Sequence, residues 1–100
     1  MQRQKDIKDE RLQDIVNKIL AVADPDKIML YGSRARNENG SRSDFDIAVF
    51  GKVNIDKIWD NLQEADTLLK IDLVAFDELT NEILKKKILA EGIILYERKI

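Results

Sequence analysis

Apolar side chains recur at intervals of three and four positions between residues 6 and 23. This spacing places them on one face of an α-helix, and the residues concerned are Leu12, Ile15, Val16, Ile19 and Val22. Pro25 closes the pattern, because proline disfavours helical geometry in the residue before it and has no backbone N–H to donate. The pattern therefore predicts an amphipathic helix that ends near Ala23.

Four shorter apolar runs are typical of buried strands. They cover residues 28–31, 44–50, 71–76 and 93–96. Two further helical patterns lie between them, one capped by Asn54 and one capped by Asp77 that runs to about Ala90. The order α-β-β-α-β-α-β predicts an α/β (α+β) fold, with a single mixed sheet of about four strands flanked by helices.

The two later helices are expected to turn apolar stripes inward. These stripes comprise Ile55, Ile58, Trp59 and Leu62 in the first helix, and Leu79, Ile83, Leu84 and Ile88 in the second. Trp59 is accordingly expected in the core or in an interface, and the run Lys85 to Lys87 on a solvated helix face. At 100 residues, the chain is expected to form one domain, residues 1–100.

The composition limits which side chains can take part in catalysis or bind a metal ion. The sequence contains no cysteine and no histidine, which excludes disulfides, thiolate metal sites and the commonest general base. Reactions must therefore use carboxylates, hydroxyls, lysine or arginine, and any metal should be one that prefers oxygen ligands. No apolar run approaches the length of a membrane span, and no signal-peptide pattern opens the sequence. The protein is therefore expected to be cytoplasmic and not to associate with a membrane.

Charge is unevenly distributed along the chain. The net charge of −2 does not favour nucleic acid as a stable partner. Arg34, Arg36 and Arg42 nevertheless lie within nine residues of one another. This cluster indicates contact with something anionic, although ordinary exposed loop arginines remain an equal alternative.

Two aspartates interrupt the second apolar run. Asp44 and Asp46 are two positions apart, so on a strand their carboxylates face the same side and repel each other. A divalent cation between them would make the arrangement favourable. Asp72 lies in the third run and completes three carboxylates if the two strands pair; Glu64 and Asp66 are nearby alternatives outside a strand.

A turn follows the first apolar run at Gly32-Ser33. Glycine lets a backbone N–H approach an anion closely, and the serine hydroxyl adds a donor, which suits a phosphate. Alone, this pair indicates only a turn. Ten residues separate Ser33 from Asp44, and the combination of this turn, Asp-x-Asp and a later strand aspartate is far more specific than its parts.

The segments Tyr31 to Arg36 and Ser43 to Ile47 resemble the signature of the DNA polymerase β-like nucleotidyltransferase superfamily. The short length and the wording Gly-Ser-Arg-Ala-Arg are similar to the minimal nucleotidyltransferases, the antitoxins of toxin–antitoxin pairs with HEPN-domain proteins. The resemblance implies that Gly32 and Ser33 hold the terminal phosphates of the donor nucleotide. Arg34 and Arg36 are further candidates for contact with the triphosphate, with an acidic partner as the alternative.

The same resemblance assigns the carboxylates. Asp44, Asp46 and Asp72 would be the catalytic residues and the ligands of Mg²⁺, with two ions expected and Mn²⁺ as a substitute. The implied reaction transfers AMP from ATP to a hydroxyl of a HEPN-domain toxin, with pyrophosphate as the leaving group. The partner is expected to supply the acceptor surface in a homo- or hetero-oligomer, because the chain is too short for an acceptor domain of its own.

Two alternatives to this function stay open. The acceptor could be a tRNA end or a small molecule instead of a protein. The chain could also be a non-catalytic antitoxin that blocks its partner sterically, although such a role does not need three acids on one sheet.

Overall fold

The computed structural model describes residues 3–4, 10–32, 45–63 and 71–99. Three helices are present: α1 (Glu10–Val22), α2 (Ile55–Gln63) and α3 (Glu82–Glu91). The strands are β1 (Arg3–Gln4), β2 (Lys27–Tyr31), β3 (Phe45–Phe50), β4 (Ile71–Ala75) and β5 (Ile93–Glu97), and a 3₁₀ turn, η1 (Phe76–Glu78), follows β4. The predicted α+β element order is therefore confirmed.

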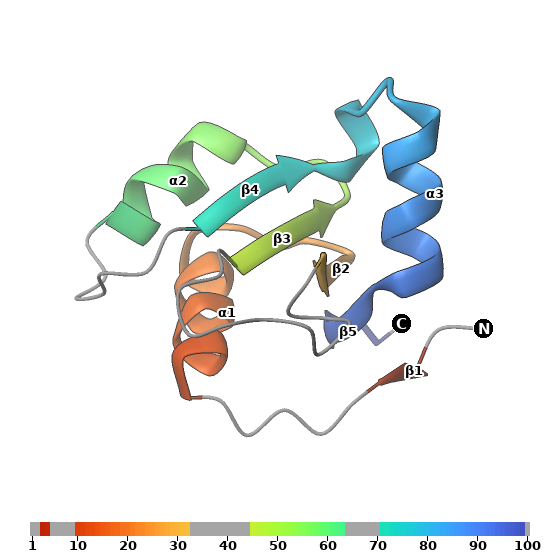
Figure 1. Ribbon diagram of the computed structural model, residues 1–100. Coiled ribbons are helices and arrows are strands. Elements are labelled where there is room, and N and C mark those ends of the chain that lie inside the picture. The colour runs from red at the N-terminus through yellow and green to blue at the C-terminus, as the bar shows by residue number, and fades with distance from the viewer. Residues whose placement is uncertain (1–2, 5–9, 33–44, 64–70, 100) are drawn as a thin grey trace.

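The strands form one mixed sheet in the order β1-β5-β2-β3-β4. Strand β2 is antiparallel to both β3 and β5, whereas β3 and β4 run parallel. Parallel neighbours need a crossover connection, and α2 lies within the one that joins β3 to β4. Figure 1 shows this crossover, with α2 to one side of the β3–β4 pair.

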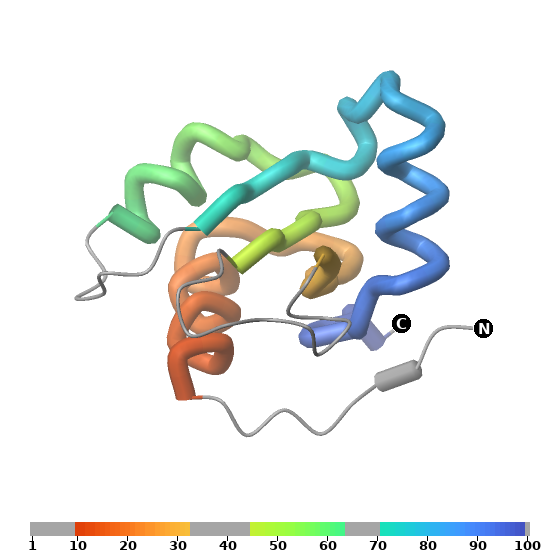
Figure 2. The backbone as a smooth tube through the Cα atoms, in the orientation of Figure 1, coloured from red at the N-terminus to blue at the C-terminus, as the bar shows by residue number. Residues whose placement is uncertain are grey.

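Helices cover both faces of the sheet (Figures 1 and 2), with α1 and α2 on one side and α3 on the other. Alternate residues of the strands supply the two cores, as the period of two along a strand requires. One core joins α1 and α2 to Ile28, Leu30, Phe45, Ile47 and Val49. The other joins Ile88 of α3 to Met29, Tyr31, Ala48, Phe50 and Ile94.

The short strand β1 was not predicted from the sequence. It pairs in parallel with β5, Arg3 opposite Ile93 and Gln4 opposite Ile94. Strand β5 therefore has neighbours on both sides, β1 and β2, and does not form an open edge of the sheet over this stretch. Strand β4, at the opposite end of the strand order, is the edge strand next to β3.

The start of the last helix differs from the prediction. Asp77 lies in η1, and Asn81 caps α3 by accepting a hydrogen bond from the backbone N–H of Leu84 at 3.1 Å. The ring of Phe76 stacks on that of Phe50, with centroids 4.1 Å apart, so the chain packs against the sheet before the helix begins. The predicted cap at Asp77 was therefore wrong.

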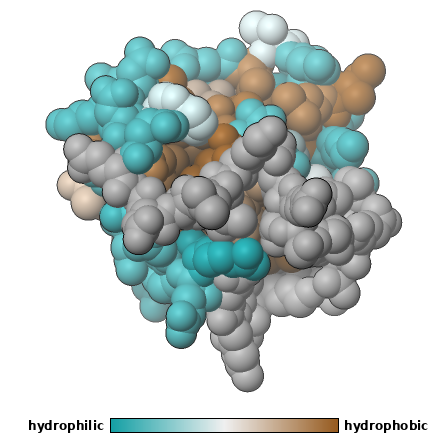
Figure 3. Space-filling model, turned by 60° about the vertical axis from the view of Figure 1, so that its left-hand side comes forward, coloured by the Kyte–Doolittle hydropathy of each residue, from teal (hydrophilic) through white to brown (hydrophobic). Residues whose placement is uncertain are grey.

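The inward face of α3 is also narrower than predicted. Ile88 is fully buried, but Ile83 is 81% exposed and its predicted inward position was wrong. With 3.6 residues per turn, the face that carries Leu84 and Ile88 points away from Ile83. Trp59 is 40% exposed, so it is not a core residue. In Figure 3 hydrophobic residues likewise reach the surface among hydrophilic ones.

Replacing the cap residue Asn81 with alanine should lower the free energy of unfolding by about 1 kcal/mol, since the Leu84 N–H loses its acceptor. Asn81→Asp should restore most of this loss. Urea unfolding followed by circular dichroism measures the difference. The control is Asn17→Ala in α1, where the amide bonds only to the exposed Gln13 side chain. Equal effects of the two alanine variants would contradict the assigned cap.

The end of β5 is fixed to the connection between α1 and β2. The Arg98 guanidinium lies 3.0 Å from a carboxylate oxygen of Asp24 and 3.6 Å from one of Asp26, and the Arg98 N–H donates to the Asp26 carbonyl. The Asp26 N–H donates in turn to the carbonyl of Phe50. None of the helices in the described part of the chain is long and apolar enough to cross a membrane.

Candidate active site

Asp46 lies near the start of β3, between two side chains that the sequence separates widely. Its register partner on β2 is Tyr31, and its register partner on β4 is Asp72. Residues directly opposite one another share a face of the sheet, so Tyr31, Asp46 and Asp72 form a row across three strands. Asp46 is half-buried and Asp72 is exposed. The expectation that Asp72 lies beside Asp46 is met by the pairing of β3 with β4.

The turn at Gly32 adjoins this row. Gly32 is buried and has a φ of 78°, a left-handed conformation that glycine adopts without strain. A Cβ atom at this position would lie 2.2 Å from Oδ2 of Asp46 and 3.2 Å from its Cγ. The carboxylate of Asp46 therefore occupies the space that any side chain at residue 32 would need.

The structure does not describe the other residues of the predicted site. Ser33, Arg34, Arg36, Arg42 and Asp44 lie outside the described residues, as do the alternative acids Glu64 and Asp66. The described residues contain no group of three acidic, histidine or cysteine side chains able to hold a metal ion. They do bring together two of the three predicted carboxylates, and the roles of the remaining residues stay predictions.

The two described carboxylates fit a cation that prefers oxygen ligands. Neighbouring strands lie about 4.8 Å apart, so Asp46 and Asp72 place like charges close together on one face. Such charges repel each other unless a cation compensates them. Carboxylate oxygens are the ligands that Mg²⁺ prefers, and this donor set suits it or Mn²⁺.

Tyr31 is the residue of this row that the sequence analysis did not single out. Its side chain is only 6% exposed. Burial raises the pKa of its phenol to about 12, and the negative charges of Asp46 and Asp72 add to this effect. The hydroxyl therefore stays protonated at neutral pH. Only the pairing of β2 with β3 reveals this position, because it depends on contacts between distant segments.

Above its ordinary pKa of 10.0, Tyr31 should make folding stability fall with pH. The unfolded chain releases the phenolic proton near that value, whereas the folded chain keeps it to about 12. This contribution is therefore complete below pH 10 and is lost as the pH rises to about 12. The free energy of unfolding is expected to fall by roughly 1–3 kcal/mol over this pH range.

Tyr31→Phe isolates this effect, because phenylalanine keeps the ring and has no proton to release. Urea unfolding of both proteins without divalent cations, at pH values on either side of this window, measures it. The stability of the original protein relative to the variant should drop with pH. Parallel pH dependences for the two proteins would show that Tyr31 does not titrate in this way.

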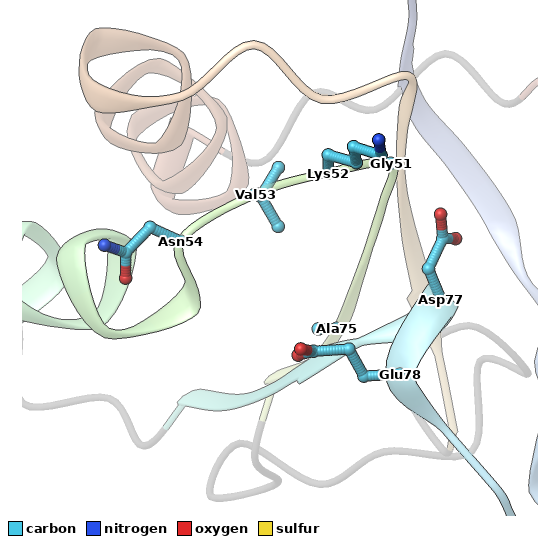
Figure 4. A pocket seen from close by; sticks show the side chains of 7 residues that line it. All are labelled: Gly51, Lys52, Val53, Asn54, Ala75, Asp77 and Glu78. Carbon is cyan, nitrogen blue, oxygen red and sulfur yellow. The ribbon is translucent and has the colours of Figure 1, made fainter.

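A pocket lies at the opposite end of β3 and β4 (Figure 4). It has a volume of about 390 Å³ and is lined by Gly51, Lys52, Val53, Asn54, Ala75, Asp77 and Glu78. Strands β3 and β4 run parallel from the Asp46–Asp72 end toward this pocket. Its lining mixes one lysine with two acids, and it contains no residue of the predicted site. The pocket is therefore separate from the candidate active site.

A comparison with known protein families shows to which family the chain belongs. The family model described as polymerase beta, nucleotidyltransferase, matches residues 10–100. The chain belongs to this nucleotidyltransferase family. The match spans the Gly32 turn, Asp46 and Asp72, and the mixed sheet agrees with the fold that the sequence resemblance implied. A search of curated proteins found no match.

Solved structures support the same fold for this nucleotidyltransferase. A toxin–antitoxin crystal structure with AMP-PNP has a TM-score of 0.68 at 24% identity, covering 87% of this chain and 74% of that chain. A mutant of the toxin–antitoxin MntA-HpeT has a TM-score of 0.69 at 20% identity, covering 88% and 74%. A second MntA-HpeT mutant gives 0.66 at 19% identity, covering 94% and 76%. At these identities the likeness shows the fold alone.

Proposed function

We propose that this nucleotidyltransferase transfers AMP from ATP to a hydroxyl of a partner protein, and that it is the antitoxin of a HEPN-domain toxin. The observation that carries the proposal is the register of Asp46 with Asp72 beside the Gly32 turn. Membership of the nucleotidyltransferase family supports the reaction class. The similarity of its fold to toxin–antitoxin structures, one of them with AMP-PNP, supports the donor and the kind of partner.

The site residues form two groups in the proposed reaction, one for the triphosphate and one for the metal ion. The backbone at Gly32 and the predicted donors Ser33, Arg34 and Arg36 bind the triphosphate. Asp46 and Asp72, with the predicted Asp44, hold Mg²⁺. When bound there, Mg²⁺ neutralises charge on the phosphates and makes the acceptor hydroxyl more acidic.

Asp72 is suited to proton transfer because of its place in the sheet. It is exposed on the edge strand β4, so an acceptor hydroxyl can approach it from solvent. A carboxylate oxygen of Asp72 takes the hydroxyl proton as the acceptor oxygen attacks the α-phosphorus. Pyrophosphate leaves from the opposite side. Asp46 lies half-buried between Tyr31 and Asp72 and serves as a metal ligand.

The experiment combines the purified protein with Mg²⁺, the proposed HEPN-domain partner, and ATP labelled on either the α- or the γ-phosphate. Label from the α-phosphate should appear on the partner, and label from the γ-phosphate should not. The control variant Asp60→Asn changes an exposed acid of α2 away from the row and should transfer normally.

Three results would argue against the proposal. Transfer of the γ-label would indicate a kinase, and exclusive labelling of an added tRNA or small molecule would move the acceptor to another class. Neutralisation of the toxin that survives removal of Mg²⁺ and loss of Asp46 would indicate a steric antitoxin.

A further inference from the structure

We infer that Gly32 is a positioning residue for the carboxylate of Asp46, in addition to any contact it makes with phosphate. This inference rests on the proposed role of Asp46 as a metal ligand. Its basis is the contact between the two residues: a Cβ added at Gly32 would meet Oδ2 of Asp46 at 2.2 Å, far inside any normal contact distance. The absence of a side chain at residue 32 thus determines where the carboxylate can lie.

The second positive-φ glycine of the described residues provides a contrast. Gly51 has a φ of 106°, and a Cβ added there would lie 3.0 Å from Oδ2 of Asp26 and 3.1 Å from both its Cγ and its backbone N. These contacts are tight, but each needs a shift of only a few tenths of an ångström, far less than the 2.2 Å contact at Gly32 requires. Asp46 is half-buried within the sheet, and both its Cγ and its Cβ also lie close to the added atom, at 3.2 and 3.5 Å. Rotation of the carboxylate alone therefore does not relieve the whole contact at Gly32.

The neighbours of Asp46 make displacement of its carboxylate unfavourable. Tyr31 occupies the register position on one side and is buried. Asp72 occupies the position on the other side, so a shift in that direction brings two negative charges closer. A side chain at residue 32 would thus move the Asp46 carboxylate out of the arrangement that suits a shared cation.

The turn at Gly32 would therefore contribute both to the metal site and to the triphosphate site. Gly32 shapes the position of a metal ligand through its missing side chain, and its backbone belongs to the turn predicted to hold the triphosphate. Residues that orient a metal ligand typically affect metal affinity by about 10–100-fold when replaced. A glycine needed only for phosphate contact would affect nucleotide binding and leave metal binding unchanged.

The test measures Mn²⁺ binding by electron paramagnetic resonance without nucleotide. We expect Gly32→Ala to weaken Mn²⁺ binding by about 10–100-fold. The control Gly51→Ala likewise places alanine at a positive φ, away from the row, and should bind Mn²⁺ as the original protein does. Equal Mn²⁺ affinity of Gly32→Ala and the original protein would overturn the inference. Absence of Mn²⁺ binding by the original protein would instead count against the proposed function.

A stability measurement keeps the test decisive if Gly32→Ala is poorly folded. Gly32→Ala should lower the unfolding temperature more in the original protein than in an Asp46→Ala background, because the second variant lacks the carboxylate that the new methyl group meets. The strain of a positive φ is the same in both backgrounds and cancels. An equal drop in both backgrounds would show that the two residues are not coupled and would overturn the inference.

Discussion

Asp46→Asn should reduce AMP transfer by about 10²–10⁴-fold. The substitution keeps the size of the side chain and removes the negative charge next to Asp72, so the site loses a ligand for Mg²⁺. A bound metal ion contributes several kcal/mol of transition-state stabilisation, and each 1.36 kcal/mol corresponds to a factor of ten in rate. Single-turnover transfer of α-labelled AMP to the partner protein, at saturating ATP and Mg²⁺, measures the loss.

Two comparisons separate this effect from a folding defect. Circular dichroism should show the same helix and strand content for Asp46→Asn as for the original protein. Asp60→Asn removes the same charge from the exposed face of α2 and should keep full transfer. Retention of more than about a tenth of the transfer rate by Asp46→Asn would rule out an essential ligand role.

Phe45→Ala should lower the free energy of unfolding by about 3–5 kcal/mol. Phe45 is fully buried and is among the largest side chains in the core beneath α1 and α2. Its removal deletes apolar contacts, leaves a cavity and also removes the ring over which the Arg11 guanidinium lies at 5.4 Å. Since domains of this size are stable by only about 5–15 kcal/mol, the variant should be close to unfolding.

The comparison for Phe45→Ala is Ile83→Ala in α3. Ile83 is 81% exposed, so its truncation should change the stability by no more than about 0.5 kcal/mol. Urea unfolding of both variants provides the measurement. A large loss of stability from Ile83→Ala would mean that its side chain is covered in solution. A loss below about 1 kcal/mol for Phe45→Ala would contradict its central place in the core.

Much of the fold follows from local patterns in the sequence. The helix before Pro25 and the strand formed by the apolar run of β3 follow from local patterns, and both are confirmed. The Asn54 cap is confirmed as well, because its side chain accepts a hydrogen bond from the Lys57 N–H at 3.2 Å. These features are short-range, so a single sequence contains the information that determines them.

The start of α3 shows where local patterns are insufficient. Asp77 and Asn81 are both good cap residues four positions apart, and their side chains alone do not decide between them. In the structure Asn81 is the cap, and Phe76, just before Asp77, stacks on Phe50 in a different part of the sheet, a contact that the sequence does not reveal. The outward position of Ile83 follows from its spacing relative to Leu84 and Ile88 on the helix. Strand β1, only two residues long, has too little sequence to form a recognisable pattern.

The candidate site was predictable in kind but not in arrangement. The spacing of Gly32, Asp46 and Asp72 marked these residues as candidates, because the chemistry of phosphate and metal binding restricts the residue types. The position of Tyr31 opposite Asp46, and the contact of Gly32 with that carboxylate, depend on which strands become neighbours. Those contacts join residues that are distant in the chain, and a single sequence does not specify them.

The alignment of Asp46 with Asp72 limits how related sequences can change in length. Extra residues in the parts of the connection 51–70 that lie outside α2 would leave both strands in place, so homologues should vary in length there. One residue gained or lost inside β4, between Asp72 and Ala75, would shift Asp72 by one position relative to the rest of the strand and turn it to the opposite face of the sheet. Length changes within this strand should therefore be rare among active relatives.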